Sequence, residues 1–421
     1  MIKFEHHYLS NGLQVILAPQ ENRSLIASSL LYRVGSRNDP KGRTGFAHLF
    51  EHLMFAGGQS VDNFDERLQA AGGDSNAFTS RDTTVYFNMV PSENLDTALW
   101  LESDRMRGLK FSQKILETQQ RVVVEEFKET CLEEPYGDAE HHLYGLAFDQ
   151  HPYRHPVIGE DFFQIESAQL EEVKTFFYQY YRPNNAVLCL CGGFDPEIAL
   201  NKVRNYFGDI PSGPVDFEAI PQELPQKVHK RKTVFGEVPS PALYFGYRSV
   251  GRLHPDFHAL SVLSFLLGGG KSSLLRRRLM REQEIFHSLS VGMSNSFDPD
   301  LFQIIGVPAE DVDHERARNL LLQTIEQVKQ EGIPKQEMQK VINRLEIINY
   351  YNDVSLDSRA EELCFFAALG RPEMINEEYE LFKSISIDDL NRCLHHYLDL
   401  NHCSELTYLP DQDATISAEA N

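Results

Sequence analysis

The predicted elements of this 421-residue chain occur in the same order twice, and this repetition restricts the fold more than any other feature. In each half a strand is followed by a helix that runs into glycines, and then by further strands and long helices. These segments are residues 24–34, 45–58, 74–91 and 94–134 in the first half, and residues 241–250, 257–270, 287–309 and 313–369 in the second. The order predicts a duplicated α+β unit.

A Pro-rich stretch separates the two halves. Residues 210–232, "IPSGPVDFEAIPQELPQKVHKRK", contain four prolines and few periodic apolar residues, which is typical of a linker. A chain of 421 residues also exceeds what one hydrophobic core usually supports. We therefore expect an N-terminal domain over residues 1–209, a linker over 210–232 and a C-terminal domain of similar fold over 233–421.

Charge and composition exclude several classes of protein. The formal net charge of −22 argues against a general nucleic-acid-binding protein, which needs a basic surface. No apolar run is long enough to span a membrane, and the first residues, "MIKFEHHYLSNG", do not have the pattern of a signal peptide. The six cysteines form no C-x-x-C pair and lie mostly in apolar segments. We expect buried free thiols in a cytoplasmic protein, or a periplasmic one if a leader has been removed.

The stretch "GFAHLFEHLMFAGG", residues 45–58, places two histidines four positions apart with a glutamate before the second. Residues three and four apart lie on one face of a helix, so His48, Glu51 and His52 share a narrow sector. Zinc binds neutral imidazole and usually needs a third protein ligand, with one position left for water. A nearby carboxylate that does not bind the metal can move a proton from this water to a leaving amine. H-x-x-E-H, the inverted form of H-E-x-x-H, meets these requirements.

A second interpretation of the motif is three polar residues on an ordinary amphipathic helix. With 16 histidines in the chain, H-x-x-E-H arises by chance about once in twenty such sequences. The neighbouring residues of the segment are strongly apolar, which predicts a mostly buried helix whose polar groups need partners. The motif by itself is compatible with both interpretations, and the apolar neighbours favour the metal site.

Three segments together resemble a known family. "RTGFAHLFEHLMFAGG", "AGGDSNAFTSRDTTVYFNMVP" and "QQRVVVEEFKE" are similar to the zinc peptidases pitrilysin, insulin-degrading enzyme and the mitochondrial processing peptidase. The resemblance covers nearly the whole chain, and is strong over residues 20–200 and weak beyond residue 240. It implies a processing-peptidase-like metallohydrolase fold of class α+β. In this fold two similar halves each contain a mixed, largely antiparallel sheet packed with helices, and only the first half binds metal.

In this family a glutamate on a later helix is the third zinc ligand. Glu126 lies 74 positions after His52 (126 − 52) and fits the aliphatic-x-x-Glu-apolar context of the family better than Glu125 does. The three valines before these glutamates indicate a packed helix segment. Glu126 shares a helix face with Val122 and Val123, so we expect it to point inward and Glu125 to be solvated.

Carried over residue by residue, the resemblance assigns His48, His52 and Glu126 as the ligands of one Zn²⁺ ion per chain, and Glu51 as the general base. The implied reaction is hydrolysis of peptide bonds in unfolded peptides or small polypeptides. Zinc would activate a water, and Glu51 would remove its proton and later protonate the leaving amine.

The same resemblance points to substrate-binding residues and to a residue that would hydrogen-bond a zinc ligand or water. Asn76 and Ala77, in "DSNAFTS", match positions of an edge strand that contacts extended substrate, since such a strand offers unpaired N–H and C=O groups to a peptide. Without the family, Asn76 would be interpreted as a strand-start or turn residue. Seven positions before Glu126, where active members often have a glutamate, stands Gln119, which can hydrogen-bond a ligand or water but cannot share a proton.

The second half departs from the family. "LLGGGKSSLLRRRLMRE" resembles a glycine-rich segment that often has an arginine after the paired serines, and Leu274 occupies that place. The segment lacks the G-x-x-x-x-G-K-[ST] spacing of a phosphate loop and follows a helical pattern. The arginine and tyrosine with which larger relatives hold substrate are not placed in this sequence. The remaining histidine groups show no convergent spacing with a carboxylate and are interpreted as structural: His141, His142, His151, His155, His395 and His396.

The length matches small bacterial-type members of the family, in which two chains close around a chamber and sometimes only one has zinc ligands. We therefore expect a homodimer, or a heterodimer with a related family member, that acts on peptides and neither binds nucleic acid nor spans a membrane. The alternative is a non-catalytic subunit of this fold that serves assembly or partner binding. The intact H-x-x-E-H weighs against this alternative.

Overall fold

The structure, a computed structural model, describes residues 1–214 and 219–411. Its contacts divide the chain into two compact units. The first unit comprises Met1–Phe127, His155–Ile220 and Asn349–Glu378. The second comprises Lys128–Arg154, Pro221–Ile348 and Tyr379–Asn421. Each unit is an α+β structure built on one sheet.

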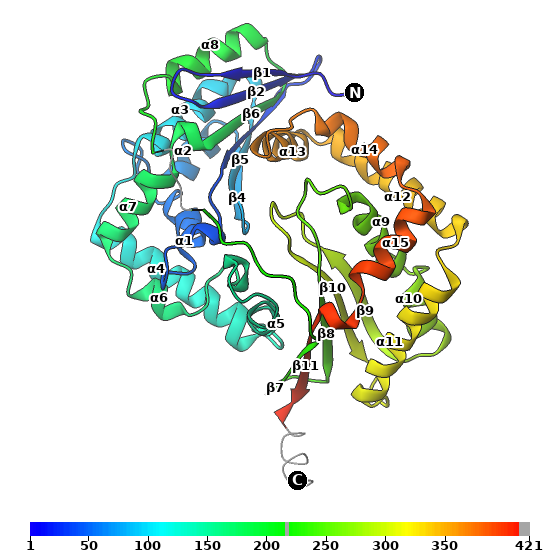
Figure 1. Cartoon of the computed structure of the whole chain (residues 1–421). Helices are drawn as coiled ribbons and strands as arrows, with labels where there is room; N and C mark the ends of the chain where they lie inside the picture. Colours follow the sequence, from blue (N-terminus) through cyan, green and yellow to red (C-terminus); the bar gives the residue numbers. More distant parts are fainter. Residues whose placement is uncertain (215–218, 412–421) are drawn as a thin grey trace. The chain divides into compact units, whose positions relative to one another are not determined.

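A six-stranded sheet forms the centre of the first unit (Figure 1). Its order is β1-β2-β6-β3-β5-β4, with β2 and β6 parallel and all other neighbours antiparallel. The strands are β1 (Glu5–Tyr8), β2 (Gln14–Pro19), β3 (Leu25–Tyr32), β4 (Asp74–Thr79), β5 (Thr84–Pro91) and β6 (Ala186–Gly192). Because β4 is the last strand, one of its edges has no partner strand in the sheet.

Both faces of this sheet are buried, so its inner strands are apolar at successive positions. In β2, Val15 and Leu17 belong to the core on one face, whereas Ile16 and Ala18 belong to the core on the other. The first core is covered by helices from the first half of the chain, and the second by α13 (Leu356–Ala368). The other helices of the unit are α1 (Phe46–Leu53), α2 (Phe64–Ala70), α3 (Leu95–Arg107), α4 (Gln113–Phe127), α6 (Phe162–Glu166), α7 (Leu170–Tyr180) and α8 (Pro196–Phe207).

The five-stranded sheet of the second unit repeats this topology. Its order is β7-β11-β8-β10-β9, again with the first pair parallel and the others antiparallel. The pattern equals that of β2-β6-β3-β5-β4, which confirms the duplication predicted from the sequence. The strands are β7 (Lys230–Gly236), β8 (Ala242–Arg248), β9 (Phe286–Met293), β10 (Leu301–Pro308) and β11 (Cys403–Pro410).

Helices also cover both faces of the second sheet. One core packs mainly against α9, α10, α11 and α15, and the other against α5. The helices are α5 (Ala139–Ala147), α9 (Phe257–Gly268), α10 (Leu274–Arg276), α11 (His314–Glu331) and α15 (Ile387–Tyr397), with α12 (Lys335–Val354) and α14 (Met374–Ser384) crossing the division between the units. Two π-helical turns follow α4 and α10, at Lys128–Glu133 and Arg277–Glu282.

Each unit thus includes a helix from the other half of the sequence. Helix α5 precedes residue 209 but packs on the second sheet, and α13 follows residue 233 but packs on the first. The contact-defined units therefore differ from the predicted collinear domains in these two segments. The predicted linker, residues 210–232, also includes the first three residues of β7, and its residues 215–218 lie outside the described part of the chain. As an edge strand rich in Lys and Arg, β7 lacks the apolar periodicity that marks a buried strand.

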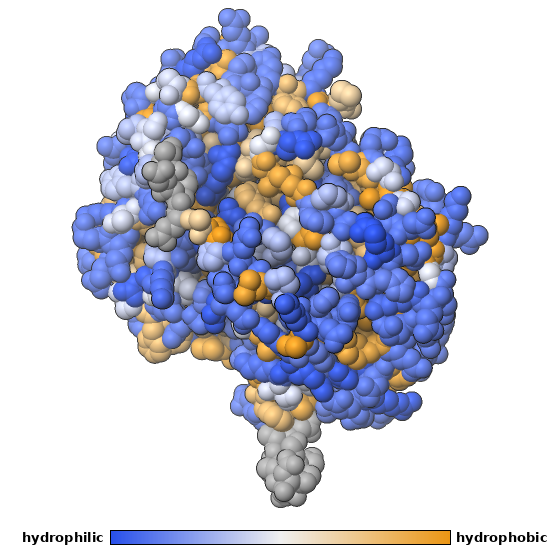
Figure 2. Space-filling model, in the orientation of Figure 1, coloured by the Kyte–Doolittle hydropathy of each residue, from blue (hydrophilic) through white to orange (hydrophobic). Residues whose placement is uncertain are grey.

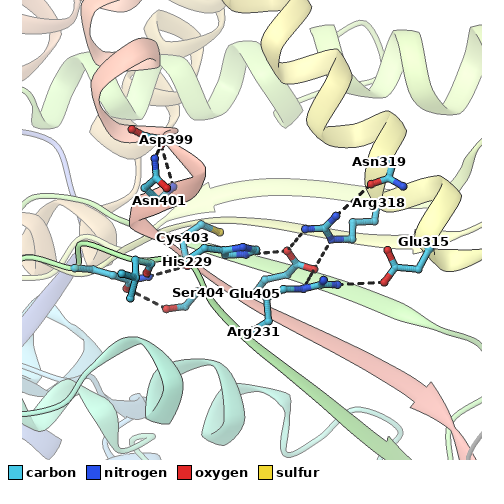
Figure 3. Close-up of polar contacts among 12 residues, drawn as sticks. His229, Arg231, Glu315, Arg318, Asn319, Asp399, Asn401, Cys403, Ser404 and Glu405 are labelled. Atoms are coloured by element: carbon cyan, nitrogen blue, oxygen red, sulfur yellow. Dashed lines mark hydrogen bonds and ion pairs between the residues drawn. The ribbon is translucent and has the colours of Figure 1, made fainter. Parts of the chain in front are cut away.

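The second unit contains a fully buried carboxylate, Glu405 of β11 (Figure 3). Arg318 donates to it from Nε at 2.6 Å and from a terminal nitrogen at 2.9 Å, and Arg231 donates from Nε at 3.2 Å. His229 lies 3.0 Å away, and burial lowers the pKa of its imidazole. The network connects β7, β11 and α11 inside one unit, so we interpret it as structural.

Two expectations about composition can be compared with the structure. All six cysteines are free and buried, as expected. None of the described helices combines the length and the apolar character needed to cross a membrane. On the face that Figure 2 shows, hydrophilic residues predominate and apolar residues lie in separate groups.

Candidate metal centre

Helix α1, which contains H-x-x-E-H, begins in an unusual way. Gly45 precedes the helix at φ +87°, a conformation that favours glycine, and a Cβ atom there would lie 2.7 Å from the carbonyl oxygen of Ile158. The first N–H groups of the helix are bound by the half-buried carboxylate of Asp39. Its oxygens accept from the N–H of Gly45 at 2.6 Å and from the N–H of Ala47 at 2.9 Å. The cap comes from an acidic residue that lies well before the helix in sequence.

The structure brings His48, His52 and Glu126 together. Nε2 of His48 lies 3.4 Å from Nε2 of His52 and 3.6 Å from Oε1 of Glu126, and Nε2 of His52 lies 3.3 Å from Oε2 of Glu126. The two histidines come from α1 and the glutamate from α4, and these helices pack together in the first unit. Among the residues that the structure describes, this is the one group of three or more His, Cys, Asp and Glu side chains that could hold a metal ion.

The spacing of these atoms fits zinc. With ligand–zinc bonds of about 2.0–2.2 Å, two ligand atoms at tetrahedral corners lie about 3.3–3.6 Å apart. This agrees with the 3.4 Å between the two imidazole nitrogens, and each nitrogen lies at such a distance from one of the two Glu126 oxygens. Burial lowers the pKa of His48, so its imidazole is held in the neutral form that binds metal. A hydrogen bond with His52 lowers the pKa of Glu126, which favours the carboxylate. The protonation states therefore also suit a cation.

Helix α4 distinguishes the two candidate glutamates. Glu126 points to the histidines, whereas Glu125 is exposed, as predicted. One argument behind that prediction is wrong: Val122 is 45% exposed, and only Val123 on that face is buried. Glu126 itself is partly exposed, so its face of the helix borders solvent at the site and does not point into a closed core.

Glu51 lies beside the ligand group and has one strong partner. The hydroxyl of Thr79 donates to Oε2 of Glu51 at 2.6 Å. Thr79 is the last residue of β4, so the bond connects α1 to the edge strand of the sheet. Sequence reasoning did not identify Thr79. The only available signal was its place in "DSNAFTS", two residues after a predicted substrate-binding position.

The other predicted site residues lie near the group but outside it. Asn76 and Ala77 are on β4, and the N–H of Ala77 donates to Oδ1 of Asn76 at 2.8 Å. A peptide that pairs with β4 here would compete with the Asn76 side chain for this N–H. Gln119 lies two turns before Glu126 on α4, is half-buried, and makes no side-chain hydrogen bond within the described residues.

Other histidines contact single carboxylates, which the sequence spacing did not suggest. Nε2 of His142 lies 2.9 Å from Asp138, one helical turn away, and its Nδ1 is 2.9 Å from Nζ of Lys232. Two more pairs have longer distances: His151 with Asp298 at 3.4 Å, and His155 with Glu160 at 3.5 Å. His395 and His396 lie in the last turn of α15.

The second unit has no counterpart of the metal group in its described residues. Helix α9 occupies the place that α1 has in the repeated topology, and His258 is its sole histidine. The glycine-rich segment follows a helix, as expected, which supports the rejection of a phosphate loop. Leu274 is buried in the core of this unit, so an apolar contact stands where the family often has an arginine.

Comparison with known proteins identifies the family. Residues 14–161 match the family described as insulinase (peptidase family M16), and residues 167–345 match the peptidase M16 inactive domain. The chain belongs to peptidase family M16.

Several relatives are named as zinc proteases. The chain is 30% identical to the zinc protease PqqE of Helicobacter pylori over 349 residues, which are 80% of this chain and 78% of that protein. It is 27% identical over 289 residues to the mitochondrial-processing peptidase subunit beta of Lentinula edodes, covering 64% of this chain and 60% of that one. The crystal structure of a protease from Helicobacter pylori superposes with a TM-score of 0.92 at 27% identity, over 97% of this chain and 100% of that chain. These relatives confirm the family and the fold expected from the sequence.

Proposed function

We propose that this chain is a zinc-dependent endopeptidase that hydrolyses peptide bonds in unfolded peptides or small polypeptides. The observation that supports this best is the convergence of two imidazole nitrogens and the two carboxylate oxygens of Glu126 from two helices, at 3.3–3.6 Å, with Glu51 beside them. Membership of family M16 and the names of the relatives support the same reaction. His48, His52 and Glu126 would hold one zinc ion.

A zinc ion bound there would supply a Lewis acid that polarises a water molecule and a peptide carbonyl. Glu51 accepts the proton of the attacking water and afterwards donates it to the leaving amine. The edge strand β4 binds the substrate as an added strand, through main-chain groups near Asn76 and Ala77, which gives affinity with little demand on sequence. Gln119 would hydrogen-bond near the ligands without exchanging a proton.

Three glutamine variants test this proposal. Glu51→Gln removes the base but no ligand, so it should retain about one zinc per chain, measured by elemental analysis, and lose cleavage of a quenched peptide. Glu126→Gln should lose zinc as well as activity. Glu125→Gln is the matched control, because Glu125 is exposed on the same helix turn, and it should retain both. Undiminished cleavage by Glu51→Gln would refute the mechanism.

We also propose that the chain works as a dimer, with a second copy or with a related chain. The relative named as subunit beta of a processing peptidase supports this. Cleavage assays of the chain alone and together with related chains, combined with analytical ultracentrifugation, would test it. A well-folded chain that binds no zinc would instead support the alternative function, a non-catalytic subunit that serves assembly or partner binding.

A further inference from the structure

We propose that Thr79 is a positioning residue that holds Glu51 in the orientation needed for proton transfer. This inference rests on the proposed peptidase function. The hydroxyl of Thr79 donates to Oε2 of Glu51 at 2.6 Å, and neither residue is part of the ligand group. A carboxylate side chain has several rotatable bonds, and a short bond to a charged acceptor restricts them.

The hydrogen bond also distinguishes the two oxygens of Glu51. Oε2 accepts from Thr79, and no side chain in the described part of the protein donates to Oε1. Oε1 is therefore the oxygen that is available to accept the proton of a water. A general base works only when the accepting atom lies within hydrogen-bonding reach of that proton, so the orientation of this carboxylate matters for the rate.

Thr79 can hold Glu51 because its own position is rigid. The turn that follows it is closed by Ser80, whose Oγ accepts from the N–H groups of Asp82 and Thr83 at 3.1 and 2.9 Å. Asp82 is buried and pairs with Arg37 at 3.0 Å. The donor therefore belongs to an ordered turn.

One loop connects this turn to the helix that contains Glu51. The N–H groups of Ser36 and Arg37 donate to the carbonyl oxygens of Ser80 and Arg81 at 3.2 and 3.0 Å. A Cβ atom on Gly35, the first residue of this loop, would lie 2.5 Å from the backbone of the turn. At its other end the loop contains Asp39, which caps α1. The loop over residues 35–39 thus sets the distance between β4 and α1, and the Thr79–Glu51 bond connects the same two elements at the site.

Strand β4 connects substrate binding to the orientation of the general base. Ala77 and Thr79 lie two residues apart on β4, so both side chains are on the same face of the strand. A peptide that adds to the edge of β4 near Ala77 is aligned by the strand that also orients Glu51. Thr79 therefore contributes to kcat through Glu51 and makes no direct contribution to substrate affinity.

The test uses two variants of Thr79 in the full-length, zinc-loaded chain. Thr79→Val has nearly the same shape but no hydroxyl, and should lower kcat about 10–100-fold, the usual effect of losing an outer hydrogen-bond partner, with KM unchanged. Thr79→Ser restores the donor and should regain most of kcat. The matched control is Ser75→Ala, which removes a hydroxyl–carboxylate bond of 2.9 Å to Asp65 from the same strand and face. This control should leave kcat unchanged.

Two further measurements separate the possible outcomes. A zinc competition titration of Thr79→Val should give the affinity of the unmodified chain, and its crystal structure should show the Glu51 carboxylate turned away. Full kcat in Thr79→Val, or a raised KM with normal kcat, would overturn the proposal, the latter because Thr79 would then be a substrate contact. If the unmodified chain shows no zinc-dependent cleavage, the proposed function itself fails and the role of Thr79 fails with it.

Discussion

The cap on α1, the helix with the two candidate histidine ligands, allows a quantitative prediction. Asp39 is half-buried and accepts from two N–H groups at the start of α1, those of Gly45 and Ala47. Asp39→Ala would leave both donors buried without an acceptor. Each of the two N–H groups should cost between about 1 kcal/mol, the lower value for a buried unsatisfied group, and about 2 kcal/mol, the upper value for a lost cap, so the first turn of α1 should be destabilised by about 2–4 kcal/mol.

Hydrogen–deuterium exchange measures this effect locally. A loss of 2–4 kcal/mol corresponds to amide exchange in α1 that is faster by about 30- to 900-fold. Asp161→Ala is the control, because Asp161 caps α6 from an exposed position at 2.9 Å, and should cost about 1 kcal/mol in that helix alone. Unchanged exchange in α1 after Asp39→Ala would show that the helix start does not depend on this carboxylate.

The pH dependence of stability shows which of two opposing effects on the pKa of Asp39 is larger, its burial or its hydrogen bonds. Burial raises the pKa of Asp39 to about 8, although its N–H donors favour the charged form. The folded pKa then lies above the unfolded value, so stability relative to Asp39→Asn is greatest at low pH. This difference in stability should fall between about pH 4 and pH 8, by up to about 1.4 kcal/mol per pH unit, and should be constant above pH 8. If the difference instead grows with pH, hydrogen bonding outweighs burial and the carboxylate is charged.

Three more predictions concern stability and zinc. Glu405→Ala leaves Arg318 and a second arginine without their shared partner and should cost about 3–5 kcal/mol in urea unfolding, whereas Glu315→Ala, at a half-exposed ion pair of 3.1 Å, should cost under about 1 kcal/mol. Equal costs would contradict the structural role of the buried network. Gly45→Ala forces the start of α1 to shift and should lower zinc content measured by elemental analysis. Chelation of zinc should lower Tm, because only the folded site binds the ion. A Tm insensitive to chelator would contradict the metal site.

Much of the candidate site could be predicted because its parts are local patterns. The positions of His48, Glu51 and His52 on one helix face follow from helical periodicity alone. Glu126 was found by combining family context with the face of its helix, although one of the two valines used in that argument is exposed. The duplicated order of strands and helices was also visible in the sequence, since each element has its own apolar period.

Two residues that contact α1 could not be predicted from the sequence. Asp39 and Thr79 both contact helix α1 or its start, but nothing in their local pattern indicates a partner. Their roles depend on the loop over residues 35–39, which packs against a turn more than 40 positions later. Such contacts become visible only when the chain is folded.

The sequence by itself determined most of the elements and the helix face that contains the candidate ligands His48 and His52, because both depend on spacing within a few residues. The tertiary structure decided which sheet each helix covers. Helices α5 and α13 pack on the sheet of the opposite half, so that both faces of each sheet are buried. An apolar helix face can be buried against either sheet at similar gain, so its own pattern does not specify the partner. The complementary shapes of the complete cores make that choice.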